Sequence, residues 1–557
     1  MDGKQDASME GCNQVVSSLQ SKPEIPKPES SISTFGTILS TSQEDLMLLH
    51  KGTRIAVIGA GISGITAANI LKKNGYEPVV FEKSDQVGGV WAVAYPNIHL
   101  QNTYPSYHLS DFPWPFRPDL HPSGTQILKY WNEAVRHLRL DVRLSHEVLA
   151  LEEQADGWLL RYRNESGEHA ESFKYAMVAV GQYTEGKYRP QFPGEEQFGG
   201  RIITEREVRS MDIFEGKRVA VVGFGKSALD MSTFAAPNAA EVHHIFRTPR
   251  WTIPEWILGV HFTHILFSRF GTVMMTSWAH PTPAERFLHG PLKAGIDKFW
   301  DMIASLFTWQ IEKLGKNKDQ AARDRLSAVL PKHKFLPDMR SAGALAPERY
   351  YPLVAEGRIQ PHPGEVAGFS TNAIQLKSGC EIPCDLVVLS MGSQTPVFPF
   401  LPEKYRKMLE CEPDGAQLYR HLLHPRIPRL GFAGFNHGFM HIPEVEIGTL
   451  WLCAYLQGEI KLPAVEEMER SVEYVRAWKR AHIQFEPSRS LATNTRFQQY
   501  IDILLKDLGV SPYRKLPNIF AEIFGRYGSA DYTGVVEEYN RKSSGGSQPR
   551  LPLQVDT

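Results

Sequence analysis

The chain has 557 residues, of which 42% are hydrophobic and 22% are charged, so it is long enough for two or three globular domains with cores of their own. The formal net charge is −1, and this balance offers no basic surface of the kind that binds nucleic acid. The 5 cysteines of the whole chain are too few for a disulfide framework.

The first 50 residues are rich in Ser, Gln, Lys, Glu and Pro and contain no sustained apolar run. This composition predicts a disordered tail over residues 1–50, because such a segment cannot bury enough apolar surface to fold. The segment also lacks the basic start and apolar stretch of a secretory signal peptide, so we expect a cytoplasmic protein.

A short apolar strand is predicted over residues 54–58, followed by the turn Gly59-Ala60-Gly61-Ile62-Ser63-Gly64 and a helical pattern. In a dinucleotide-binding unit the first glycine permits the turn, the second lets the backbone approach a pyrophosphate, and the third lets the helix pack close to the strand. The next strand ends at Glu82, with Lys83 beside it, about 20 residues after the turn, where a carboxylate binds ribose hydroxyls. We therefore predict an FAD site here. Glu82 alone also fits a solvated charge at a strand end.

Further segments are predicted to reach the same flavin. The turn Gly88-Gly89-Val90-Trp91 can press its backbone onto a phosphate or the ribityl chain, and the polar loop Gln101-Asn102-Thr103 follows it. A helix is predicted over residues 123–138 from its apolar spacing. We assign two strand ends to the same site, Val148 and Gly181.

A second unit of the same kind begins with a strand over residues 218–222 and the turn Gly223-Phe224-Gly225-Lys226-Ser227-Ala228. Its next strand ends at Arg247 and Thr248, so a cation replaces the acid of the first unit and fits a 2′-phosphate. This predicts an NADPH site, and two dinucleotides in one chain imply electron transfer between them. Two alternatives remain open: Arg247 or Arg250 in a surface salt bridge, and Asp230 as an acid serving the helix dipole rather than the nucleotide.

Residues 251–334 form a helical and aromatic insertion. Residues 256–279 are apolar over a length that would cross a membrane, but His261, His264 and Arg269 make spanning costly. We expect a buried or pocket-covering helix, with contact to a membrane surface or a partner as the alternative. An apolar stripe at helical spacing then fits either a protein core or a lipophilic wall beside the substrate entry: Ile296, Phe299, Trp300, Ile303 and Phe307.

A third buried strand runs from Cys384 to Gly392, and a late strand ends at Gly434; both glycines are assigned to the cofactor site. The predicted fold is α/β, with two Rossmann-like dinucleotide-binding domains, the NADPH domain inserted into the FAD domain, and the helical insertion. The predicted parts are FAD-binding residues 51–214, NADPH-binding residues 215–383, FAD-binding residues 384–540 and a flexible tail over 541–557.

Cys380 and Cys384 lack the spacing of a redox dithiol, which disfavours a flavin disulfide reductase.

In this order the motifs resemble the class B flavin-containing monooxygenase family, from about Arg54 to about Tyr474. Asn102-Thr103 followed by Asp111-Phe112-Pro113, and Pro443-x-x-Glu446 further on, add to the resemblance. The chain also departs from the family. Thr204 and Val208 stand where the family fingerprint has a histidine and an aromatic residue, and Ser393 alters a second motif. The Trp-Pro ending of the Baeyer–Villiger fingerprint is absent from this stretch.

The resemblance implies that NADPH reduces FAD, that O₂ adds at the flavin C4a to give a (hydro)peroxide, and that one oxygen atom passes to a small lipophilic substrate. It implies N- or S-oxygenation, with Baeyer–Villiger ketone oxygenation as the alternative, and no metal. Asn102 would be the catalytic amide near the flavin ring, although it also fits a residue that caps a turn. The altered Thr204 and Ser393 keep a third reading open: an NADPH–flavin reductase or oxidase, or a redox-sensing FAD- and NADP-binding module.

Overall fold

The computed structural model describes residues 48–544, except 183–185, 258, 276–278, 342–343, 437, 483–492 and 494–495. The predicted N-terminal tail therefore falls outside the described residues up to position 47. Leu49 belongs to the folded body, because its side chain is buried and its N–H donates to Leu456 O at 2.9 Å. The loose tail predicted from residue 541 is wrong at its start, because helix α17 (Val535–Ser544) runs through it; residues 545–557 lie outside the described part.

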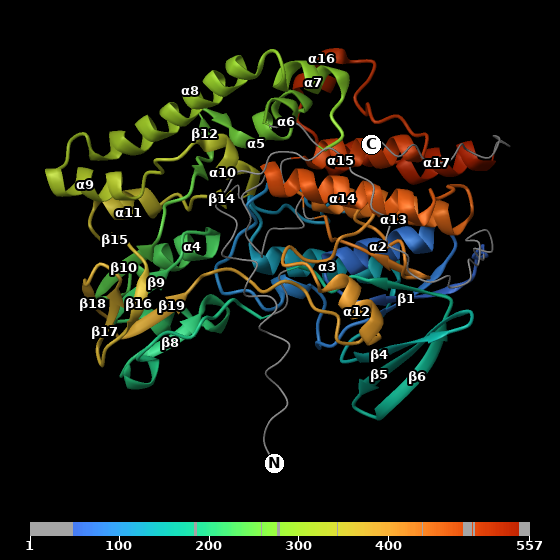
Figure 1. Ribbon diagram of the computed structural model, residues 1–557, viewed down its shortest axis with the longest axis horizontal. Coiled ribbons are helices and arrows are strands. Elements are labelled where there is room, and N and C mark those ends of the chain that lie inside the picture. The colour runs from blue at the N-terminus through green and yellow to red at the C-terminus, as the bar shows by residue number, and fades with distance from the viewer. Residues whose placement is uncertain are drawn as a thin grey trace, which may run out of the picture. The chain divides into compact units, whose positions relative to one another are not determined.

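Five parallel strands form the first sheet, in the order β20-β7-β1-β2-β3. Its central strand β1 is labelled in Figure 1. Their bounds are β1 (Arg54–Ile58), β2 (Glu77–Phe81), β3 (Asp141–Arg143), β7 (Tyr175–Val178) and β20 (Leu430–Phe432). Ile58 lies opposite both Phe81 and Val178, so three strands end at one edge of the sheet. The late strand predicted before Gly434 is confirmed as β20.

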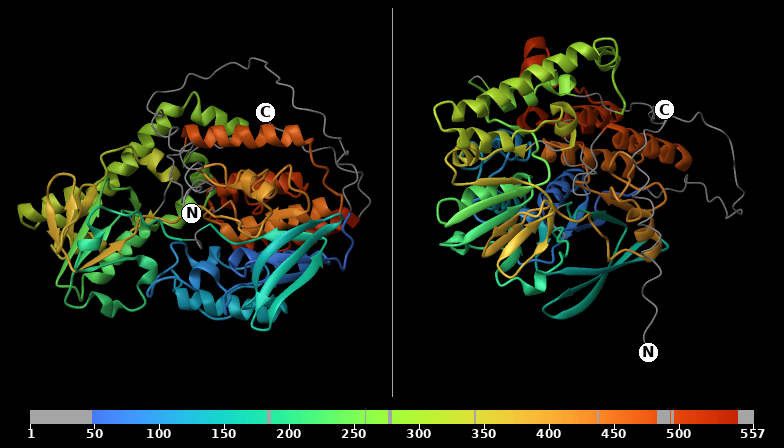
Figure 2. Two further views of the ribbon diagram at one scale, coloured as in Figure 1. Left: turned by 60° about the horizontal axis from the view of Figure 1, so that its bottom comes forward. Right: turned by 60° about the vertical axis from the view of Figure 1, so that its left-hand side comes forward.

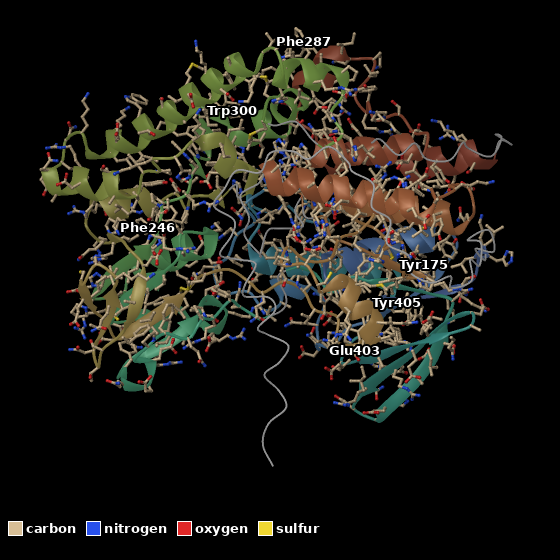
Figure 3. All side chains as sticks on the ribbon, viewed as in Figure 1. Tyr175, Phe246, Phe287, Trp300, Glu403 and Tyr405 are labelled. Carbon is tan, nitrogen blue, oxygen red and sulfur yellow. The ribbon has the colours of Figure 1, made fainter. Side chains whose placement is uncertain are left out.

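Alternate residues of the first sheet face two different layers, as the period of a strand requires. Tyr175 packs with helices α2 (Ile62–Lys73), α3 (Gly124–Leu138) and α13 (His441–Leu456), whereas Ala176 packs with Tyr405 and Trp158 on the other face (Figure 3). The predicted helix over 123–138 is confirmed as α3, and Ser123 caps it by accepting from Gln126 N–H. Trp158 belongs to an antiparallel sheet of β4 (Glu147–Gln154), β5 (Gly157–Asn164) and β6 (Gly167–Phe173).

The second five-stranded sheet is also parallel, in the order β15-β10-β9-β19-β8, and Figure 2 shows both sheets from two further sides. Its strands are β8 (Arg201–Thr204), β9 (Arg218–Val222), β10 (Glu241–Phe246), β15 (Gln360–Pro363) and β19 (Leu386–Leu389). Helix α4 (Lys226–Ala235) follows β9. A small antiparallel sheet packs beside them: β16 (Val366–Phe369), β17 (Ala373–Leu376) and β18 (Glu381–Pro383).

The expectation that the FAD domain resumes at Cys384 is wrong for this strand. Val387 of β19 lies opposite Ala220 of β9 and Ile202 of β8, so the strand completes the second sheet. β8 joins the same sheet, although its residues fall within the predicted FAD-binding part 51–214. A strand buried on both faces shows the same apolar run whichever parallel sheet it joins, because its pattern carries no record of its neighbours.

The single helix expected over residues 256–279 is also wrong. A hairpin of β12 (Trp256–Ile257) and β13 (Val260–His261) comes first, and two short helices follow, α5 (Phe262–Leu266) and α6 (Arg269–Met275). Ser268 separates the helices, because its hydroxyl accepts the N–H of Gly271 at 3.0 Å. No helix among the described residues is long and apolar enough to cross a membrane.

The aromatic stripe predicted in the insertion lies on helix α8 (Lys293–Glu312), and its buried members face the protein core (Figure 3). The indole N–H of Trp300 donates to Met274 O at 2.8 Å. The ring of Trp300 stacks on the ring of Phe335 with their centroids 5.5 Å apart, and Phe307 packs edge-on against the ring of Phe335. Of the two readings of the stripe, the structure supports the core.

The remaining elements surround these sheets. In chain order they are β11 (Thr252–Ile253), α7 (Pro283–His289), α9 (Gln320–Ala328), α10 (Phe335–Ser341), β14 (Ala344–Leu345), α11 (Tyr350–Ala355), α12 (Glu403–Leu409), α14 (Val465–His482), α15 (Phe497–Asp507) and α16 (Ile519–Phe524).

Candidate functional site

A cavity of about 1850 Å³ reaches the carboxyl ends of strands from both parallel sheets. Its volume exceeds the roughly 300–1,000 Å³ of a pocket for one small ligand, so more than one large molecule fits. Most of the predicted cofactor residues line it: Gly59, Gly61, Ile62, Ser63, Glu82, Lys83, Gly89, Val90, Trp91, Gln101, Asn102, Val148, Gly181, Gly223, Gly225, Ser227, Arg247, Thr248, Gly392 and Gly434. The predicted residues outside its lining are Ala60, Gly64, Thr103, Ala228 and Asp230.

The first glycine turn needs glycine at two positions for reasons internal to the fold. Gly59 has φ +107°, and a Cβ there would lie 2.6 Å from Ala179 O. A Cβ on Gly64 would lie 1.9 Å from Gly59 O, so this glycine lets helix α2 pack against the turn. Gly61 differs, because a Cβ on it would meet nothing nearer than Gly89 Cα at 3.6 Å. The fold therefore tolerates a methyl group at Gly61, whereas a phosphate approaching the backbone would not.

Glu82 is a buried structural acceptor as well as a cavity residue. Its Oε2 accepts the N–H of Ala60 at 2.7 Å, and its Oε1 accepts the N–H and the hydroxyl of Ser84 at 3.0 and 2.7 Å. The reading of Glu82 as a solvated charge is therefore wrong. An ionised carboxylate has about four acceptor positions, so these bonds leave capacity for ribose hydroxyls.

In the second unit, Gly223 has φ +128°, and a Cβ there would lie 2.2 Å from Ser390 O. Asp230 is buried behind the turn: Tyr95 donates to its Oδ2 at 2.8 Å, and Lys226 pairs with its Oδ1. Burial and this neighbouring carboxylate raise the pKa of Tyr95 well above its ordinary value. Asp230 thus holds Tyr95 and Lys226 at the cavity wall, a role for which the sequence offered no signal because Tyr95 is remote in the chain.

The two arginines after β10 have different surroundings. Arg247 is exposed and lines the cavity. The Nε of Arg250 lies 2.5 Å from Oδ1 of Asp338, which is fully buried. Arg250 lines the cavity too, but the salt-bridge reading holds for it, so Arg247 is the arginine of this pair that we assign to a phosphate.

The loop that carries Asn102 is held from three sides. Gln101 accepts the N–H of Leu345 at 3.0 Å, Thr103 accepts from Arg526 at 2.8 Å, and the side-chain amide of Asn102 donates to Phe439 O. These partners belong to β14, the C-terminal segment and the chain before α13. Asn102 therefore lines the cavity from a loop that three other segments hold in place.

The family-motif positions that differ in this chain have local structural roles. Thr204 caps a short helical turn, since its N–H and hydroxyl both donate to Glu207 Oε2. Val208 is fully buried in the core of the second sheet. Ser393 accepts from Lys187 at 3.2 Å, and Lys187 pairs with buried Glu205 at 2.7 Å.

Sequence reasoning missed this Lys187–Glu205–Ser393 group, which lines the cavity, and it missed His441, whose Nε2 lies 2.8 Å from Ser63 Oγ. Neither group has a local motif. Glu446, which the resemblance singled out, lies outside the cavity lining and accepts the N–H of Ser110 at 2.9 Å. Burial raises the pKa of Glu446 to about 8.

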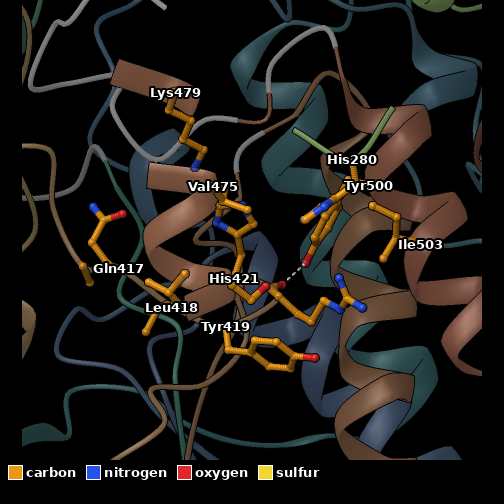
Figure 4. Close-up of a pocket in the computed structure, with 13 residues that line it drawn as sticks. His280, Gln417, Leu418, Tyr419, His421, Val475, Lys479, Tyr500 and Ile503 are labelled. Carbon is orange, nitrogen blue, oxygen red and sulfur yellow. Dashed lines mark hydrogen bonds between the residues drawn. The ribbon is translucent and has the colours of Figure 1, made fainter. Parts of the chain in front are cut away.

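A second pocket, drawn in Figure 4, is far smaller, at about 30 Å³. It contains His421 and Lys479, and Tyr500 donates to Arg420 O there at 2.8 Å. Burial lowers the pKa of Lys479 to about 7. Since one water molecule needs roughly 10–15 Å³, this pocket holds little more than ordered water, and the large cavity is the candidate site.

Two parallel sheets, each followed by a glycine turn on one shared cavity, define a fold with two dinucleotide-binding units. The model of the "Flavin-binding monooxygenase-like" family matches residues 52–288. The chain is 29% identical to "Probable flavin-containing monooxygenase 1" of Arabidopsis thaliana, covering 86% of this chain and 96% of that protein. It is 25% identical to "Dimethylaniline monooxygenase [N-oxide-forming] 2" of Cavia porcellus, covering 82% and 83%.

Among solved structures, a cyclohexanone monooxygenase variant from Rhodococcus sp. Phi1 bound to NADP⁺ superposes with a TM-score of 0.62 at 17% identity, covering 83% of this chain and 98% of that one. The predicted fold class is confirmed by these structures. The predicted resemblance is confirmed as well, because residues 52–288 match the flavin-binding monooxygenase-like family model and the similarity to flavin-containing monooxygenases extends over most of the chain. These matches support an enzyme of the flavin-containing monooxygenase class, whose reaction consumes O₂ and an organic substrate.

Proposed function

We propose that this monooxygenase transfers one oxygen atom from O₂ to a nucleophilic nitrogen or sulfur atom of a small organic substrate. The observation that carries the proposal is the continuous cavity that reaches both glycine turns and Asn102. The relative named as N-oxide-forming supports nitrogen as an acceptor atom. For a substrate atom X, one NADPH, one proton and one O₂ yield NADP⁺, water and X–O.

The residues present fit both cofactors. Helices α2 and α4 begin at Gly61 and Gly225, which have no side chain to cap the first-turn N–H groups, so these donors face the cavity for a phosphate. Glu82 would hold the adenosine ribose of FAD, and Arg247 the 2′-phosphate of NADPH. When bound, FAD supplies the redox chemistry that side chains lack.

In this proposal Asn102 donates to the oxygen that develops negative charge during transfer. An amide suits this role because it does not titrate, and its loop is anchored before the reaction begins. The walls around it must exclude water, since water would release the oxygen as H₂O₂ instead of product. Tyr95, held by Asp230, lines the cavity beside the second glycine turn and would help to exclude water there.

The test is a substrate panel with the purified FAD-loaded protein, NADPH and O₂. The panel contains a tertiary amine, a thioether and a cyclic ketone, each followed by mass spectrometry together with NADPH consumption and H₂O₂ release. An N-oxide or S-oxide product supports the proposal. Conversion of only the ketone to a lactone would contradict it in favour of Baeyer–Villiger oxygenation, and H₂O₂ without any product would favour the reductase or oxidase reading.

A further inference from the structure

We propose that His121, Glu255 and His261 bind a divalent transition-metal ion, and zinc, which such a ligand set accepts, is the ion used to test the site. The site lies behind the Asn102 loop, and no metal was expected from the sequence. Its ligand types, two imidazoles and one carboxylate, are those that zinc accepts at about 2.0–2.2 Å. The proposal is independent of the oxygenation chemistry.

The geometry of the three side chains brings their ligand atoms around one point. Oε1 of Glu255 lies 3.7 Å from Nε2 of His121 and 3.8 Å from Nε2 of His261, and all three atoms lie within 4.8 Å of one another. The distances of 3.7 and 3.8 Å are too long for hydrogen bonds. They fall within the roughly 4 Å that two ligand bonds of 2.0–2.2 Å span across a shared ion.

Both imidazoles direct a buried nitrogen toward this point. His261 is 6% exposed, and neither its Nε2 nor that of His121 has a hydrogen-bond partner among the described residues. A buried polar nitrogen without a partner costs free energy. An ion shared with Glu255 removes that cost at both nitrogens.

The opposite nitrogen of the His121 ring is held in the way that a metal-bound histidine requires, whereas Nδ1 of His261 accepts the N–H of Thr263 and lies nearer still to the Thr263 hydroxyl. Nδ1 of His121 lies 3.1 and 3.0 Å from the carbonyl oxygens of Leu100 and Asn102, so it carries the proton and leaves Nε2 with its lone pair. Nδ1 of His261 lies 2.8 Å from Thr263 Oγ1, and the backbone N–H of Thr263 is more distant at 3.4 Å. In the metal-bound form Nδ1 of His261 donates to that hydroxyl.

The position of the site suggests what the ion does. His121 hydrogen-bonds to the loop that carries Asn102, whereas Glu255 directly precedes β12 and His261 ends β13 in the hairpin of the insertion. A bound zinc would therefore tie the insertion to the Asn102 loop. Three protein ligands leave a fourth position for water.

The experiment uses the purified FAD-loaded protein, stripped with a chelator, dialysed against ZnCl₂ and then freed of unbound metal. Metal content is measured by mass spectrometry, and a parallel CoCl₂ titration is followed by its visible absorption. We expect one zinc per chain in the wild type and none in Glu255→Gln or His261→Ala. Thr263→Val should weaken zinc binding by roughly 10- to 100-fold through the loss of the bond to Nδ1.

His264→Ala is the matched control, because His264 is exposed on the same helix as Thr263 and is not in the cluster. It should retain full zinc and FAD content. FAD content and melting temperature of every metal-free variant separate metal loss from unfolding. If His261→Ala does not fold, the zinc content of Glu255→Gln decides the test, because this substitution preserves side-chain volume. A wild-type protein without stoichiometric zinc, or a Glu255→Gln variant that binds as much as the wild type, would overturn the proposal.

Discussion

The first dinucleotide unit ends in a buried carboxylate and the second ends in an exposed guanidinium, although both begin with the same glycine turn. Glu82 is tied by three hydrogen bonds to Ala60 and Ser84, so it belongs to the framework of its turn. Arg247 lies at the cavity without such a framework role, while neighbouring Arg250 is used by the fold. The acid is thus bound into the fold before any ligand arrives, whereas Arg247 leaves its guanidinium at the cavity, where we propose that it meets the 2′-phosphate.

The largest expected effect comes from Gly61→Ala. Because a methyl at this position clashes with nothing in the fold, the variant should fold with a nearly unchanged melting temperature and yet copurify without FAD. Gly59→Ala is the control, since its φ of +107° and the contact with Ala179 O predict a loss of stability of about 1–3 kcal/mol. Full FAD occupancy in Gly61→Ala would place the flavin elsewhere.

Asn102→Ala should come next, at about 2.7–4 kcal/mol of lost stabilisation of the reacting oxygen, or two or more powers of ten in the transfer rate. NADPH and O₂ should still be consumed, but most of the O₂ should appear as H₂O₂. The coupling ratio of product to NADPH is the measurement. Gln101→Ala loses a loop anchor without removing the amide. Equal uncoupling in both variants would assign the effect to the loop rather than to Asn102.

Arg247→Ala should reduce the preference for NADPH over NADH by one to two powers of ten, since a hydrogen bond to a charged group contributes roughly 1.5–3 kcal/mol. The ratio of kcat/KM for the two cofactors measures it. Arg250→Ala should leave that ratio unchanged and lower the melting temperature, because it deprives buried Asp338 of an ion-pair partner. The reverse pattern would exchange the roles of the two arginines.

The smallest effect tests the framework role of Glu82. In Glu82→Gln one carboxylate oxygen becomes an NH₂ group, which cannot accept from Ala60 or Ser84, so the FAD-free protein should lose about 1–3 kcal/mol of stability. The free energy of unfolding is measured by urea titration. For Arg247→Ala it should stay within about 0.5 kcal/mol of the wild-type value, as expected for an exposed side chain. If the two variants shift equally, the contrast between the units is wrong.

Much of the site was predictable because its signals are local. A glycine with positive φ, a helix starting at a glycine, and a charged residue at the end of the next strand all lie within about 30 residues of chain. The turn at Gly59 and the residues Glu82 and Arg247 follow from such patterns, whereas the assignment of Asn102 to the cavity came from the family resemblance. The Lys187–Glu205–Ser393 group and the pairing of Tyr95 with Asp230 do not follow from local patterns, because their members are remote in the sequence.

The sequence by itself determined the two βαβ units, because strand, turn and helix are adjacent in the chain and their spacing is fixed by backbone geometry. Only the tertiary structure decided which sheet β8 and β19 join, since an apolar strand fits either sheet until its neighbours are in place. The same holds for residues 256–279, whose hairpin and short helices depend on contacts with distant segments. It holds above all for His121, Glu255 and His261, whose convergence is a property of the folded chain alone.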